Sequence, residues 1–350
     1  MFNILCFTLL LAAPVNARVI SRDVTWNIGA TTAAATITLP DGPGPHPGVV
    51  LVPGSGPTDR DWRSPLLPGT NGSASLLAAE LSKAGFAVIR YDKRFTGPYA
   101  AGNLPLLHGK LSFQSHMEEV AGAVKMLKES PGVDQGRVFA LTNSEGAIHA
   151  LNCHLSGAPA FAGLVLTGVP GRKLLDVLRS QIGAQVAALP EGPAIMTGLD
   201  KLLANFMAGL PFKADPALPS GVNQLVAGFH QPANLPFTRE FITADVPAMA
   251  AKAGVPILVL IGKKDIQTSW ELDGRPLEAA LAGNKAAAFS YPENANHVLK
   301  YESKPREELS AQDGLYYNAE GKILDPEALK EIITWLRTLA FPARGKHKVL

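Results

Sequence analysis

Short apolar runs alternate with helix-length amphipathic segments through the first half of the chain, and this alternation limits the fold more than any other feature. The run at residues 48–52, Gly-Val-Val-Leu-Val, is typical of a strand buried on both faces of a sheet. Further strand-like runs cover residues 86–91, 137–142 and 161–167, and helix-like segments cover residues 75–84, 114–129 and 145–155. The alternation predicts an α/β fold with a mostly parallel sheet flanked by helices.

The alternation stops between about residues 170 and 254. Apolar residues there recur at helical spacing, as at Leu174, Leu178 and Ile182, and the few basic and acidic side chains nearly balance. Strand-like sequence returns at residues 256–261 and 288–291, and a last amphipathic helix is expected at residues 326–339. We therefore predict that residues 170–254 form an apolar helical cap inserted into one α/β domain.

The first 17 residues have the pattern of a secretory signal peptide. Residues 4–13 are apolar, which is too short to span a bilayer, and Val15 and Ala17 provide the small-residue cleavage pattern. This pattern predicts cleavage after Ala17 and an exported mature chain, residues 18–350, that is periplasmic or secreted. The alternative is a buried N-terminal strand. No other segment approaches membrane-spanning length.

The composition excludes several classes of protein. The formal net charge of +2 argues against a nucleic-acid partner, which would favour a strongly basic surface. With 47% apolar and only 18% charged residues, the chain is not intrinsically disordered. Two cysteines, Cys6 and Cys153, cannot form a disulfide framework, and Cys153 is expected to be a core residue.

Ser144 is the candidate nucleophile. It lies where the strand-like run 137–142 meets the helix-like segment that follows, within Asn143-Ser144-Glu145-Gly146. A serine in such a turn is exposed at the carboxyl edge of the sheet, next to the free N–H groups of the helix. The alternative is that Ser144 is an ordinary helix N-cap.

A nucleophilic serine needs a base, and the base needs a carboxylate that orients it. In the chain order of the α/β-hydrolases, whose nucleophile turn this strand–turn–helix serine resembles, the acid and then the histidine follow the serine, and the histidine lies beyond a late strand. That order leaves His297 and the tail residue His347. His297 lies just beyond the run at 288–291, and Asp265 follows the run at 256–261. We expect His297 to be the base and Asp265 the acid; taken singly, each could be a solvated loop residue.

An oxyanion hole is expected from two backbone N–H groups. One belongs to Glu145, directly after the nucleophile. The second is assigned to Ser55 in the Gly-rich loop 53–61 after the strand at 48–52, because glycine lets a backbone approach a substrate closely. The alternative is a simple Gly/Pro turn.

These segments resemble the α/β-hydrolase superfamily over residues 30–340. The chain is most similar to bacterial serine esterases grouped with dienelactone hydrolases and serine aminopeptidases, and the matching segments are residues 54–61, 91–94, 143–146, 262–265 and 296–297. Two positions depart from the family pattern: Pro53 stands where a histidine is usual, and Thr142-Asn143 stands where Gly-His is usual. Both positions are expected to lie in the walls of the site, and neither departure replaces Ser144, Asp265 or His297.

The sequence therefore predicts a serine hydrolase that cleaves carboxylic esters through a Ser144-His297-Asp265 triad and an acyl-enzyme. The expected partner is a small-molecule ester with a short to medium acyl or aryl group; the sequence does not give the oligomeric state. No motif for a metal, a P-loop or a dinucleotide is present, so we expect neither metal nor cofactor. Two alternatives stay open: a peptidase or acyltransferase with the same triad, and a binding protein that has lost activity.

Overall fold

The computed structural model describes residues 19–341. The predicted signal peptide, residues 1–17, and the tail residue His347 lie outside the described residues. Within residues 19–341, no helix is both long enough and apolar enough to cross a membrane.

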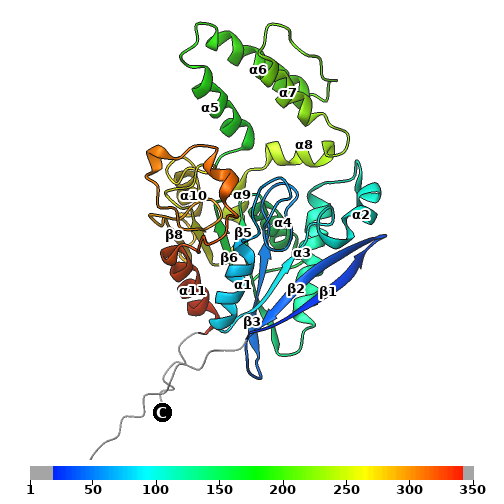
Figure 1. The fold of residues 1–350 in the computed structure, drawn as a ribbon, viewed down its shortest axis with the longest axis vertical. Coiled ribbons are helices and arrows are strands. Elements are labelled where there is room, and N and C mark those ends of the chain that lie inside the picture. Colours follow the sequence, from blue (N-terminus) through cyan, green and yellow to red (C-terminus); the bar gives the residue numbers. More distant parts are fainter. Residues whose placement is uncertain (1–18, 342–350) are drawn as a thin grey trace, which may run out of the picture.

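Eight strands form one sheet in the order β1-β2-β4-β3-β5-β6-β7-β8 (Figure 1). The first two strands form an antiparallel hairpin, and β2 also pairs antiparallel with β4, whereas every pair from β4 onward is parallel. The bounds are β1 Ile20–Ile28, β2 Thr31–Leu39, β3 His46–Val52, β4 Ala87–Tyr91, β5 Val133–Asn143, β6 Leu164–Thr167, β7 Ile257–Leu260 and β8 Ala287–Ser290. The prediction of a mostly parallel sheet is confirmed.

Helices cover both faces of this sheet, as the apolar strand sequences require. Strand β3 shows the arrangement directly: Val50 and Val52 belong to one hydrophobic core, and Val49 and Leu51 belong to the other. The first core includes residues of α3 (Phe113–Lys128), α4 (Gly146–Ser156), α9 (Val246–Lys252) and α10 (Gly274–Leu281), and the second includes residues of α1 (Ser73–Lys83) and α11 (Pro326–Ala340).

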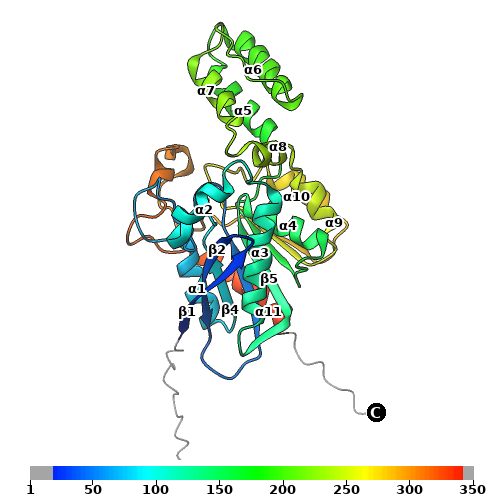
Figure 2. The same cartoon turned by 90° about the vertical axis from the view of Figure 1, so that its right-hand side faces the viewer.

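The segment between β6 and β7 contains helices only. Helices α5 (Leu174–Val186), α6 (Gly192–Met207) and α7 (Ser220–Phe229) have a small hydrophobic core of their own and project beyond the sheet, with α8 (Leu235–Thr243) beneath them (Figures 1 and 2). The fifth helix, α9, contributes Val246 and Ala250 to the main core instead. The projecting helices follow the end of β6, so they stand over the edge of the sheet where the parallel strands finish.

Helix α2 (Ala100–Leu107) is an element that the sequence pattern did not indicate. It contains Pro105 and buries only Asn103 and Leu107. A short helix with so few buried positions gives little hydrophobic periodicity, which explains why the pattern missed it.

Candidate active site

Ser144 occupies a tight turn between β5 and α4, the strand–turn–helix placement expected for it. Its φ angle is +52°, in the left-handed region that residues with a side chain seldom adopt. The Ser144 N–H donates to the Thr167 carbonyl at 2.8 Å, which fixes the turn against the end of β6. Backbone strain of this kind is found at functional sites.

Two glycines let the turn pack against the end of β3. A Cβ at Gly146 would lie 2.6 Å from the Val52 carbonyl oxygen and 2.7 Å from that of Pro53. A Cβ at Gly54 would lie 2.9 Å from Asn143 Oδ1. Because both approaches exclude a side chain, the glycines are required to bring the loop after β3 close to Ser144.

Thr142, one of the two departures from the family pattern, is completely buried and hydrogen-bonded. Its hydroxyl donates to the Val165 carbonyl at 3.2 Å, and the Thr167 hydroxyl donates to the Thr142 carbonyl at 2.6 Å. The side chain is therefore accommodated by the neighbouring strand β6 rather than by the turn itself.

Asp265 and His297 meet from two loops, one after β7 and one after β8. His297 Nδ1 lies 2.8 Å from Asp265 Oδ2, and both side chains are buried. The other carboxylate oxygen, Oδ1, accepts from the backbone N–H groups of Gln267 at 2.7 Å and Thr268 at 2.9 Å. The carboxylate is thus held in place, and His297 Nε2 is left for proton transfer.

Asn143 connects the nucleophile turn to the loop that carries the histidine. Its side-chain amide donates to the His297 carbonyl at 2.8 Å. The sequence pattern gave no indication of this contact. No local signal could have shown it, because 154 residues separate the two partners.

Ser55, Ser144, Glu145 and His297 line one cavity of about 540 Å³. Within residues 19–341, the backbone N–H groups of Ser55 and Glu145 donate to no other group of the chain, so both are free to bind an oxygen. Helices α5 and α8 complete the walls, with Leu174, Val177 and Phe241 among the lining residues. Four of the five residues predicted for the site therefore line one cavity beneath the projecting helices. The fifth, Asp265, contacts His297.

The sequence pattern of the alpha/beta hydrolase family matches residues 49–312, from β3 to beyond β8. The chain belongs to this family. Esterase EstD of Thermotoga maritima is 27% identical over 304 residues, which cover 86% of this chain and 64% of the relative. The chain thus spans less than two thirds of the length of that curated relative.

Solved α/β-hydrolase structures agree on the fold. A thermostable carboxyl esterase from Bacillus coagulans has a TM-score of 0.54 and 14% identity, with 91% of this chain and 99% of that chain covered. An enol-lactonase from Burkholderia xenovorans has a TM-score of 0.50 and 19% identity, with 89% and 99% covered. At these identities the likeness shows the fold alone.

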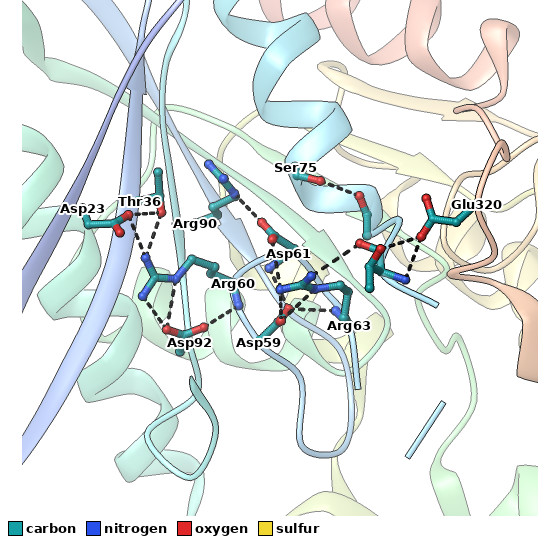
Figure 3. Close-up of polar contacts among 12 residues, drawn as sticks. Asp23, Thr36, Asp59, Arg60, Asp61, Arg63, Ser75, Arg90, Asp92 and Glu320 are labelled. Carbon is teal, nitrogen blue, oxygen red and sulfur yellow. Dashed lines mark hydrogen bonds and ion pairs between the residues drawn. The ribbon is translucent and has the colours of Figure 1, made fainter. Parts of the chain in front are cut away.

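Ion pairs hold the loop after β3. Arg60 Nη2 lies 2.7 Å from Asp92 Oδ2, and Arg90 Nε lies 2.7 Å from Asp61 Oδ1 (Figure 3). Arg94, in the neighbouring loop after β4, takes no part in these ion pairs. Arg94 instead points into the protein, where its Nε lies 3.1 Å from a carboxylate oxygen of the buried Glu119.

A buried polar cluster lies on the inner side of Glu145. Glu145 Oε1 is 3.1 Å from Lys93 Nζ and 3.0 Å from His149 Nε2, and His116 Nδ1 is 3.0 Å from Glu119 Oε2. Burial, together with the nearby His116, lowers the pKa of His149 to about 4. His149 is therefore neutral at pH 7 and donates its Nε2 proton to Glu145.

His116, Glu145 and His149 have ligand atoms within 4.8 Å of one another, which makes them a possible metal-binding group by distance. The Lys93 ammonium, however, already lies 3.1 Å from Glu145 Oε1. A divalent cation would add two positive charges beside it in buried surroundings, at a high desolvation cost. We therefore interpret the group as a polar wall behind the oxyanion hole.

Proposed function

We propose that the protein is a serine hydrolase that cleaves carboxylic esters through an acyl-enzyme. The observation that carries the proposal is the 2.8 Å contact between His297 Nδ1 and Asp265 Oδ2. His297 lines the same cavity as Ser144, whose φ angle is left-handed, and as Ser55 and Glu145, whose backbone N–H groups have no acceptor within residues 19–341. The esterase name of the Thermotoga relative supports the same reaction class.

The proposed reaction has two halves. Ser144 Oγ attacks the ester carbonyl carbon while His297 Nε2 takes the hydroxyl proton, and the Ser55 and Glu145 N–H groups bind the oxyanion. The C–O bond to the alcohol then breaks, and the alcohol leaves with the proton from His297. A water molecule, deprotonated by His297, attacks the acyl-enzyme, and the carboxylic acid is released with Ser144 regenerated.

The volume and the walls of the first cavity favour uncharged substrates of small or medium size. Its apolar walls come from Ile148 and from α5 and α8. One guanidinium also lines it, but Arg172 is already paired with Asp273, with Nε 2.9 Å from Oδ1 and Nη2 3.0 Å from Oδ2. These walls support a neutral ester as the substrate.

Two variants test the nucleophile and the base. Ser144→Ala should abolish labelling by a fluorophosphonate probe and turnover of p-nitrophenyl esters, with the melting temperature retained. His297→Ala should lower kcat by about 10³-fold or more, because triad members act as a unit. His230→Ala is the matched control, since His230 packs on Phe206 and Phe212 in the cap.

Full activity in Ser144→Ala would refute the proposal, and a loss below about tenfold in His297→Ala would mean that another group is the base. Faster cleavage of aminoacyl anilides than of p-nitrophenyl esters would identify a peptidase instead. A folded wild-type protein that the probe does not label would identify a binding protein.

We also propose export, which rests on the signal-peptide pattern of residues 4–17 alone. Expression with the native N-terminus and sequencing of the mature chain tests it: the first residue should be Arg18. Recovery of an uncleaved intracellular chain would contradict it.

A further inference from the structure

A second cavity, of about 790 Å³, shares one lining residue, Glu145, with the first. It is bounded by α2, the start of α3 and α8, which lie on one side of the molecule in Figure 1. Glu145 lines both cavities, and Gly56 and Pro57 of the oxyanion loop line the second. The apolar walls of the second cavity are Phe95, Leu104, Leu107, Leu111 and Phe237.

The position of His297 decides which part of an ester each cavity receives. The histidine lines only the first cavity, and it must protonate the leaving alcohol, so the alcohol lies on that side. The alcohol and acyl substituents of the carbonyl carbon diverge, so the acyl substituent is directed away from His297 when the carbonyl oxygen lies between the Ser55 and Glu145 N–H groups. Glu145 and the oxyanion-loop residues Gly56 and Pro57 line the second cavity, which puts this cavity within reach of an acyl chain.

Lys93 lies at a polar part of the wall of this mainly apolar cavity, which His108, His116, Asn234 and Glu145 also line. Its side chain is buried, and its ammonium group lies 3.1 Å from Glu145 Oε1 and 5.8 Å from the centre of the Phe95 ring. An ammonium group has three donors, and among the described residues Glu145 is the one hydrogen-bond acceptor for it. A buried donor without a partner is costly, so an oxygen of a ligand would stabilise this part of the cavity.

Charge balance indicates what kind of oxygen fits. The Lys93 ammonium is already paired with the Glu145 carboxylate, 3.1 Å away, and both groups are buried. A carboxylate on the ligand would lie beside Glu145 as a second buried negative charge, whereas a hydroxyl or carbonyl oxygen would not.

We propose that the second cavity is the acyl pocket and that it selects medium-length apolar acyl groups that end in a neutral oxygen. The proposal rests on the esterase function proposed above. It names the substrate class as esters of hydroxy- or oxo-substituted apolar acids, with the alcohol in the first cavity.

The first test compares acyl chains with a constant leaving group. p-Nitrophenyl alkanoates of two to ten carbons and their ω-hydroxy counterparts are assayed with the wild-type enzyme. Each methylene buried should raise kcat/KM about three- to fourfold until the cavity is filled. At one chain length the hydroxy ester should exceed its alkyl counterpart by about tenfold, and the double variant Lys93→Met, Glu145→Gln should lose this preference.

The second test fills the cavity. Ala233 lies in its wall, and Ala233→Trp should lower the ratio of kcat/KM for octanoate to that for acetate by at least tenfold. The ratio between two acetate esters with different alcohols should stay as in the wild type. Ala217→Trp, the same change at an exposed position of the cap, is the control and should alter neither ratio.

The outcomes separate this inference from the proposed function. The inference is overturned if acetate is hydrolysed normally but Ala233→Trp changes the alcohol ratio instead of the acyl ratio, or changes neither. It is also overturned if no chain length shows a hydroxyl preference. If the wild type hydrolyses no ester and Ser144 is not labelled, the esterase proposal fails, and the acyl pocket fails with it.

Discussion

At the residue scale, Thr142 fills a position in front of the nucleophile turn where the family pattern has glycine. Its buried hydroxyl bonds to the Val165 carbonyl at 3.2 Å. Thr142→Gly removes this hydrogen bond and increases the conformational freedom of the unfolded chain. We expect the free energy of unfolding to fall by about 1 kcal/mol or more.

Urea denaturation of Thr142→Gly and Thr142→Ser, with kcat measured in parallel, checks this expectation. The serine variant retains a hydroxyl and should be the more stable of the two. A glycine variant of unchanged stability and higher kcat would show instead that the threonine crowds the turn.

At the scale of elements, the contact between α4 and the end of β3 sets the geometry of the oxyanion hole. A Cβ at Gly146 would lie 2.6 Å from the Val52 carbonyl oxygen, a backbone atom that cannot move without the loop after β3. Gly146→Ala should therefore cost about 1–3 kcal/mol of stability. It should also lower kcat, because Ser55 is displaced from Glu145.

Gly228 in α7 provides the matched control, since nothing lies within 4 Å of a Cβ built there. Gly228→Ala should stabilise the protein by up to about 1 kcal/mol through helix propensity, with kcat unchanged. If Gly146→Ala is as stable and as active as Gly228→Ala, the close packing of α4 on β3 does not determine the geometry of the oxyanion hole.

At the scale of the whole molecule, the buried cluster behind Glu145 should make stability depend on pH. Burial, with the nearby His116, lowers the pKa of His149 in the folded protein from 6.5 to about 4. Between these two values the unfolded chain binds a proton at His149 that the folded chain does not. The stabilisation is therefore complete above pH 6.5 and is lost as the pH falls toward 4.

His149→Gln isolates this contribution, because glutamine can donate to Glu145 but does not titrate. Urea unfolding at several pH values between 7 and 4.5 should give a steeper loss of stability in the wild type than in the variant. The difference in slope should approach about 1.4 kcal/mol per pH unit in the middle of the window. Equal slopes would mean that His149 is protonated in the folded protein as readily as in the unfolded one.

The sequence by itself determined the sheet and the neighbourhood of the site. Strands such as β3 are apolar at nearly every position, and the helices carry one apolar face, so the local periodicity reports which elements form and which faces are buried. Because parallel strands end at one edge, the order of Ser144, Asp265 and His297 along the chain also predicted that they would lie near one another.

Only the tertiary structure decided how the surfaces of these elements meet. The Asn143–His297 contact, the placement of Arg94 on Glu119, and the cluster of Lys93, Glu145 and His149 join residues from different loops and helices. The second cavity likewise exists because α2, the start of α3 and α8 leave a space between them. Periodicity shows that a face is buried, but the partner of that face depends on helix packing and loop conformation, which are set by contacts between distant parts of the chain.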